Sequence, residues 1–264
     1  MAAPRGTPAV PANLKPVQIK DPVAYTDNTA EGTPFFIAYD SRSLRKESTM
    51  IFPNGNFELA NWSRRLEVLA AMCIFRDQEY AGAKRRKIDE LNAGTKELIV
   101  KELSNTQLRQ AVSVYTAYYQ STGRAGDGPL APEYIGWMAI NHQSTPAPHE
   151  LIYLCVSPRF QRRGIGAALI AHYENVVSVQ DAAWWPGGDA ERKGWARVFN
   201  TRGARQLYLR AGWRYPSPQI CRIPALDAIL ADDDPTPLRT TDVRTVIMER
   251  RIAAAQIVAL PQGE

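Results

Sequence analysis

The segment LIYLCVSPRFQRRGIGAALIA, residues 151–171, carries the strongest structural signal in this chain. It opens with an unbroken apolar run, which includes β-branched Ile152 and Val156 and predicts a strand buried on both faces. Ser157 and Pro158 end that strand. From Ile165 onward the apolar residues recur at helical spacing, so a helix with one apolar face follows at once.

The residues between this strand and this helix favour the binding of an anion. The first amides of a helix lack intrahelical partners, and the helix dipole is positive at that end. Gly164 and Gly166 allow a ligand to approach the backbone closely, and Arg159, Arg162 and Arg163 add positive charge. We therefore predict a cradle for a pyrophosphate group. The alternative is a plain strand-to-helix turn in which the glycines serve only the geometry of the chain.

Two common nucleotide-binding loops do not fit this sequence. A Rossmann fingerprint requires a third glycine where the chain has Leu169, and a Walker A loop requires Gly-Lys-Ser/Thr, which is absent. The pattern Gln161-x-x-Gly164-x-Gly166 instead resembles the acyl-CoA-binding motif of the GNAT superfamily of N-acetyltransferases, Gln/Arg-x-x-Gly-x-Gly/Ala.

A second motif of the same family lies further along the chain. Residues 204–213, ARQLYLRAGW, look like the signature Ala-x-x-Leu-Tyr-x-x-x-Gly-Phe, with Trp213 in place of the usual phenylalanine. Residues 247–250, IMER, are similar to the last strand of the family, in which Met-Glu-Lys is common. The resemblance covers about residues 108–252, with a weaker fit over 56–104.

The resemblance implies a mixed α/β (α+β) fold, in which helices flank a strongly bent β-sheet that is splayed at its centre. We expect an N-terminal extension or arm over residues 1–55, with a first strand at 35–39, and a C-terminal tail over 255–264. The acetyltransferase domain is expected to span residues 56–254. Residues 181–194, which contain Pro, Gly and Trp, form a long insertion in that domain.

Sequence patterns also predict the elements outside the two motifs. Apolar residues recur at helical spacing from Trp62 to Cys73, in a segment that turns helical at Asn56. Residues 84–104 continue as a charged helix. Strands are predicted at 111–119, 134–140, 195–199 and 243–252, and from Trp213 towards Ile223.

By the resemblance, acetyl-CoA is the co-substrate and lies in the gap of the splayed sheet. The backbone at 154–156 is expected to bind the pantetheine arm, and one of its amides to polarise the thioester carbonyl. The amides of residues 162–167 are expected to hold the pyrophosphate. The residues predicted to contact acetyl-CoA are Leu154, Cys155, Val156, Gln161, Arg162, Arg163, Gly164, Ile165, Gly166, Ala167 and Thr201, the last of which also suits a helix cap.

The implied reaction is direct attack of an amine on the thioester, which requires a base for the amine and an acid for the CoA thiolate. Tyr208 matches the tyrosine that the family places beside the CoA sulfur, and its phenol can donate a proton. The alternative for Tyr208 is packing in the apolar face of its helix. Glu150 is the candidate base, because some protein-lysine members of the family carry a catalytic glutamate near this place. Its alternatives are an exposed strand-end carboxylate, the neighbouring His149, and water alone.

The predicted activity is acetyl transfer to a primary amine of a small molecule or amino acid. Trp184 and Trp185 in the insertion suit an aromatic lid over the acceptor, or anchor the loop by burial. The acidic residues 232–234 would attract a cationic amine, or form an exposed turn. Two other functions stay open, a protein lysine or N-terminal acetyltransferase and a non-catalytic acyl-CoA-binding regulatory module.

Composition and charge limit the other possible partners. Of the 264 residues 45% are hydrophobic, and the net charge of +5 suits an anionic co-substrate but is too weak to predict nucleic-acid binding. The basic run at 84–87 is interpreted as a solvated helix face rather than a nuclear-localisation patch. No signal peptide or membrane span is recognised. We predict a cytoplasmic or nuclear monomer or homodimer without nucleic-acid or membrane partners.

The cysteines and histidines give no metal-site pattern. Cys73, Cys155 and Cys221 are far apart and odd in number, so neither a disulfide framework nor a zinc site is expected. The histidines, at 142, 149 and 172, show no ligand spacing. No metal is predicted, and a reducing compartment is inferred from the unpaired cysteines.

Overall fold

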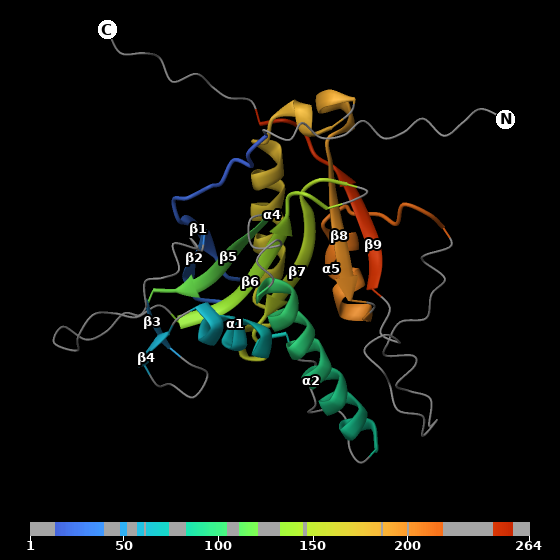
Figure 1. The fold of residues 1–264 in the computed structure, drawn as a ribbon. Helices are drawn as coiled ribbons and strands as arrows, with labels where there is room; N and C mark the ends of the chain where they lie inside the picture. The colour runs from blue at the N-terminus through green and yellow to red at the C-terminus, as the bar shows by residue number, and fades with distance from the viewer. Residues whose placement is uncertain are drawn as a thin grey trace, which may run out of the picture.

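A computed structural model describes residues 14–39, 48–51, 57–60, 62–73, 83–104, 111–120, 133–144, 147–185, 187–199, 201–218 and 245–255. Its centre is a seven-stranded sheet in the order β1-β2-β5-β6-β7-β8-β9 (Figure 1). These strands are β1 (Val23–Thr26), β2 (Pro34–Tyr39), β5 (Val112–Tyr119), β6 (Glu133–Asn141), β7 (Glu150–Val156), β8 (Lys193–Phe199) and β9 (Thr245–Arg251). A separate two-stranded sheet consists of β3 (Ser48–Ile51) and β4 (Phe57–Ala60). The helices are α1 (Trp62–Ala71), α2 (Ala83–Ser104), α4 (Ile165–Ser178) and α5 (Arg202–Arg210), with 3₁₀ turns η1 (Pro158–Phe160), η2 (Ala182–Trp184) and η3 (Gly188–Glu191).

Helices cover both faces of the main sheet (Figure 1). On one face lies α4, whose Ile165, Leu169 and Tyr173 are at most 1% exposed, and α5 joins the same core through Tyr208. On the other face, α1 and α2 form a second core around Leu66 with the side chains of β5, β6 and β7. The mixed α/β fold with flanking helices is therefore confirmed.

The sheet is splayed because strands β7 and β8 pair over only a short length. Strand β7 is antiparallel to β6 along its whole length, but its parallel ladder with β8 consists of Glu150 opposite Trp195 and Leu151 opposite Ala196. The register between β6 and β7 shifts at this point, where the extra residue lies in β7 between Leu151 and Tyr153. Such a β-bulge bends its strand, which explains why β7 turns away from β8 there. Residues 152–156, here called the open edge of β7, follow the parting of the strands.

The N-terminal part of the chain extends the main sheet. The strand predicted at 35–39 is observed as β2, which pairs with β5. Strand β1 is not predicted by the sequence, because four residues are too short to show a period. It forms a hairpin with β2, in which Tyr25 stacks on Phe35 at a centroid distance of 5.8 Å. Strands β1 and β2 thus belong to the main sheet, while the proposed domain division stays a prediction.

The helix expected from Asn56 begins later than predicted. Residues 57–60 form β4, paired with β3, and α1 begins at Trp62. The backbone hydrogen bonds between β3 and β4 stabilise the strand more than the helical spacing of apolar residues stabilises a helix. The sequence of residues 57–60 alone does not show that β3 is their partner. The helix predicted at 84–104 and the strands predicted at 111–119, 134–140, 195–199 and 243–252 agree closely with α2, β5, β6, β8 and β9.

The segment after Trp213 forms less regular structure than predicted. Among the described residues it contains an isolated bridge between Arg214 and Glu249, rather than a strand. The rest of the predicted strand, the acidic residues 232–234 and Cys221 lie outside the described residues.

Cys73 and Cys155 form a disulfide bond, so the expectation of no disulfide is wrong. Their Cα atoms are 5.2 Å apart, although they are separated by 82 positions in the sequence. Cys73 follows α1, and Cys155 points from β7 into the core that contains α1. The packing of α1 across the sheet brings the two thiols together, which spacing along the chain cannot predict. The argument for a reducing compartment loses its basis with this bond.

Candidate functional site

Tyr173 of α4 closes one end of the gap between β7 and β8. Its hydroxyl donates to the carbonyl oxygen of His149 at 2.7 Å and accepts from the backbone N–H of Trp195 at 3.1 Å. Burial raises the pKa of Tyr173, so the phenol remains a neutral donor at neutral pH. The ladder between β7 and β8 is therefore pinned at its start, and the strands part directly beyond it.

Along the open edge of β7, backbone groups face the gap between β7 and β8, and the sulfur of Cys155 does not. Leu154 and Val156 are half-buried and pack against the core around α4, whereas Cys155 is buried in the opposite core and bonded to Cys73. Neither the sulfur of Cys155 nor its backbone faces the gap, because the sulfur is bonded to Cys73 and the backbone lies opposite Trp137 in the ladder with β6. The carbonyl of Val156 already accepts from the side-chain amide of Gln161 at 3.1 Å, which ties the following loop to the strand end.

The loop between β7 and α4 has the backbone of an anion site. Arg162 and Gly164 have positive φ angles of 68° and 82°. Gly164 is the N-cap of α4, and no side chain caps the helix, so its first amides stay available to a ligand. Arg162 is exposed and Arg163 half-buried beside these amides. The geometry fits the predicted pyrophosphate cradle.

Gly166 serves the contact between two helices. A Cβ at this position would lie 3.0 Å from a methyl group of Leu207 in α5. The glycine therefore lets α5 approach the start of α4, while the ligand approach expected from sequence stays a prediction. Thr201 caps α5 by accepting from the backbone N–H of Ala204 at 3.1 Å, as its sequence position predicts.

Tyr208 lies in the core that contains the α4 side chains and is 4% exposed. Its ring meets the ring of Trp213 edge to face at 5.3 Å, and it contributes to raising the pKa of Tyr173. Burial raises the pKa of Tyr208 itself, which keeps its phenol protonated. Tyr208 thus supplies a neutral O–H group near Tyr173, at the closed end of the gap. Its ring also packs in the apolar core, which is the alternative role that the sequence suggested.

Glu150 is buried and held by an ion pair rather than exposed at a strand end. Arg197 of β8 donates to its two carboxylate oxygens at 3.2 and 3.4 Å, and the hydroxyl of Ser144 donates to one of them. Glu150 is 7% exposed. The carboxylate is therefore occupied by three donor groups from Arg197 and Ser144. Sequence reasoning missed Arg197, because the pair depends on the register of β7 with β8.

His149 is fully buried and makes a close contact with another histidine. Its Nδ1 lies 2.6 Å from Nδ1 of His142, so one ring donates and the other accepts. Burial, together with His142 and Arg192, lowers the pKa of His149 well below its ordinary value. The ring is therefore neutral at neutral pH. The sequence treats these histidines as unrelated, but the turn between β6 and β7 brings them together.

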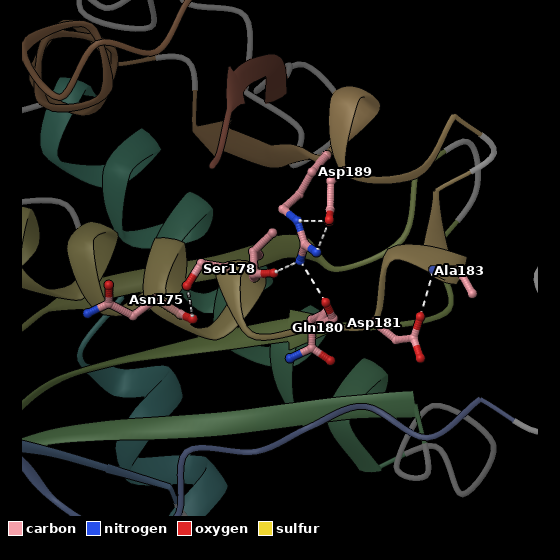
Figure 2. Close-up of polar contacts among 8 residues, drawn as sticks. Asn175, Ser178, Gln180, Asp181, Ala183 and Asp189 are labelled. Carbon is pink, nitrogen blue, oxygen red and sulfur yellow. Dashed lines mark hydrogen bonds and ion pairs between the residues drawn. The ribbon is translucent and has the colours of Figure 1, made fainter. Parts of the chain in front are cut away.

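The insertion at 181–194 packs as a cap on the C-terminal end of α4. Trp184 and Trp185 are 2% and 5% exposed and lie against the His149 ring. Buried Arg192 donates to the carbonyls of Val177 and Gln180 at the helix end, and is held by Asp189 (Figure 2). The predicted aromatic lid is therefore wrong for these tryptophans, because both are used to anchor the insertion in the core.

Comparisons with known proteins agree with the family resemblance. Residues 124–215, about a third of the chain, match the family model described as acetyltransferase (GNAT) domain. A GNAT-family protein from Desulfovibrio desulfuricans is similar at 16% identity and a TM-score of 0.39, over 82% of this chain and 99% of that one. The PaiA N-acetyltransferase from Thermoplasma acidophilum, solved in complex with coenzyme A, is similar at 15% identity and a TM-score of 0.37, over 71% and 90%. No curated protein shows a significant match.

Two features are absent from the part of the chain that the structure describes. That part contains no group of three or more His, Cys, Asp or Glu side chains that could hold a metal ion. None of its helices has both the length and the apolar character needed to cross a membrane.

Proposed function

We propose that this chain, through the acetyltransferase (GNAT) domain matched at residues 124–215, transfers an acetyl group from acetyl-CoA to a primary amine. The observation that carries the proposal is the open edge of β7, which begins where the ladder with β8 stops and leads to the uncapped start of α4. One continuous stretch of backbone can therefore meet a thioester arm and a pyrophosphate.

The proposed contacts to acetyl-CoA follow the order of the chain. Backbone groups of 154–156 would bond the pantetheine arm, and one of their amides would polarise the thioester carbonyl. The amides of 162–167 would hold the pyrophosphate, with Arg162 at the exposed side. Gln161 supports these contacts indirectly, because it joins the loop to Val156. Thr201 is a weaker candidate, since its hydroxyl already caps α5.

Tyr208 is the proposed acid. Direct attack of a neutral amine on the thioester carbonyl forms the new C–N bond and expels the CoA thiolate, which must be stabilised or protonated. A buried phenol with a raised pKa remains an O–H donor throughout the neutral range, and it can hydrogen-bond to a developing thiolate. The edge contact with Trp213 holds the ring in place.

Glu150 is kept as the proposed base, with water as its rival. Glu150 lies in the two-residue ladder that ends where β7 and β8 part, so it is close to the gap. Because its oxygens are already engaged by Arg197 and Ser144, Glu150 would act through water or after release of the ion pair. His149 is the weaker choice, because it is fully buried and contacts the anchored tryptophans.

The acceptor is proposed to be a small amine or an amino acid. Release of CoA thiol should be measured with a panel of small amines, amino acids, and histone-like and N-terminal peptides. Release with small acceptors supports the proposal, and release with peptides alone points to a protein acetyltransferase. Acetyl-CoA binding without release with any acceptor identifies a non-catalytic module. A wild-type protein that does not bind acetyl-CoA would refute all three functions.

A further inference from the structure

A turn near the N-terminus lies directly on the loop that precedes α4. Residues 27–33, here called the hairpin turn, connect β1 to β2. The backbone N–H of Asn28 donates to the carbonyl oxygen of Arg163 at 2.9 Å. The side chain of Asn28 also covers Gly164, since a Cβ on that glycine would lie 2.8 Å from it. Two segments from distant parts of the sequence therefore share one small surface.

The hairpin turn is organised by one buried carboxylate. Asp27 is 4% exposed, and one of its oxygens accepts from the backbone N–H groups of Thr29 and Thr33, at 3.2 and 2.9 Å, and from the Thr29 hydroxyl. Its other oxygen accepts from the hydroxyl of Tyr119 in β5 at 2.6 Å. Burial alone would raise the pKa of Asp27, but these hydrogen bonds outweigh it and lower the pKa to about 2. The turn is thereby fastened to the main sheet.

This contact fixes the direction of the peptide group at the start of the cradle. The peptide between Arg163 and Gly164 is planar, so its C=O and N–H point in opposite directions. Because the carbonyl is held by Asn28, the N–H of Gly164 points away from the hairpin turn. The bond also supports a strained loop, since the neighbouring Arg162 has a φ of 68°, which is unfavourable for a residue with a Cβ.

A second link joins the hairpin turn to the arginines of the loop. The hydroxyl of Tyr119 lies between Asp27 and Arg163. Burial and Asp27 raise the pKa of Tyr119, and the nearby guanidinium of Arg163 partly offsets them. The ring of Phe160 also packs against Tyr119 and Arg163. Its centroid lies 5.6 Å from the centroid of the Tyr119 ring and 5.3 Å from the Arg163 guanidinium carbon. Arg163 is thus oriented through the same residues that hold the hairpin turn.

We infer that the hairpin turn is a positioning element of the cradle, and that Asp27 sets the affinity for the diphosphate part of the acyl donor by holding the loop at 162–164 in its anion-binding conformation. The inference rests on the proposed function. A pre-organised loop binds more tightly, because less ordering is left to occur on binding. The effect is specific to ligands that carry the diphosphate, since the pantetheine arm meets β7 instead.

The test compares two ligands by calorimetric titration, CoA and pantetheine, which lacks the diphosphate. We expect Asp27→Ala to weaken CoA binding about tenfold, the effect of roughly one lost hydrogen bond, and to leave pantetheine affinity unchanged. Asp27→Asn should recover part of the loss, because its amide oxygen can still accept from Thr29 and Thr33. The matched control is Glu31→Ala, which removes the same charge from an exposed position in the same turn.

The control separates geometry from charge. If only charge mattered, Asp27→Ala and Glu31→Ala would both tighten CoA binding, since each removes a negative charge near the phosphates. Should Asp27→Ala fail to fold, Tyr119→Phe removes one hydrogen bond to the carboxylate, and we expect a CoA-specific loss of about threefold.

Three results would overturn the inference: unchanged CoA affinity in Asp27→Ala, an equal loss for both ligands, or the same loss in Glu31→Ala. Wild-type protein that binds neither ligand refutes the proposed function and the inference together. Wild-type protein that binds CoA, beside an unaffected Asp27→Ala, refutes the inference alone.

Discussion

Loss of the Cys73–Cys155 disulfide is expected to lower the free energy of unfolding by about 4.5 kcal/mol at 25 °C. The bond joins residues separated by 82 positions, so it removes many conformations from the unfolded chain. For a loop of that length, the chain-entropy relation gives a loss of about 15 cal/mol/K in the conformational entropy of the unfolded chain. Multiplied by 298 K, this entropy corresponds to the free energy above. For a chain of this size, the loss corresponds to a decrease in Tm of about 10 °C.

The assay is urea unfolding followed by tryptophan fluorescence, with and without a reductant. Reduction should lower the midpoint of the wild-type protein and raise its m-value, because the reduced unfolded chain exposes more surface. The double variant Cys73→Ala/Cys155→Ala should unfold at the same midpoint under both conditions. The matched control is Cys221→Ala, which should respond to the reductant as the wild-type protein does.

Two outcomes would refute this reasoning. The chain has three cysteines, so a denatured, unreduced sample should show one reactive thiol, that of Cys221. Three reactive thiols would show that the bond does not form. A wild-type midpoint that is the same with and without reductant would show that the bond does not stabilise the fold.

Three further predictions concern the site and its surroundings. Tyr208→Phe should lower kcat at saturating acetyl-CoA about 100-fold with little change in KM, and unchanged turnover would exclude the acid role. Glu150→Gln should remove the limb of the pH–rate profile that reports the base, whereas an unmoved profile would leave Glu150 only as the ion-pair partner of Arg197. Burial lowers the pKa of His172 from 6.5 to about 4, so the unfolded chain takes up a proton between these values before the folded chain does, and stability falls as the pH falls. When the pH is lowered from 7 to 5, the free energy of unfolding measured in urea should therefore fall by about 2 kcal/mol more for the wild-type protein than for His172→Phe. An equal decrease in both proteins would contradict the prediction.

Much of the fold could be predicted because its strongest signals are local. The apolar spacing of α4 depends on contacts between residues three and four positions apart, and Ile165, Leu169 and Tyr173 are buried as that spacing predicts. The cap by Thr201 depends on a residue three positions away. The sequence missed β1 and β4, since a short strand is stabilised mainly by its partner, and β1 depends on β2 as β4 depends on β3.

The candidate site was predicted in part for the same reason. The sequence alone located the loop with Gly164 and the helix with Tyr208, because each motif is contiguous and its function rests on local backbone geometry. It assigned Gly166 to the ligand, and it missed the close approach of Leu207 to this glycine, which depends on the packing of α5 against α4. The lid failed because a tryptophan is equally suited to an open wall and to a core, and only packing decides between them.

The tertiary structure decided which distant groups meet. It paired Cys73 with Cys155, gave Glu150 its ion pair with Arg197, and placed the hairpin turn on the carbonyl of Arg163. Each of these contacts depends on sheet register or on the packing of a helix across the sheet, which no local pattern encodes. The sequence by itself therefore identified the two motifs, with the glycine loop and the tyrosine that they contain, whereas the fold determined the partners that hold them in place.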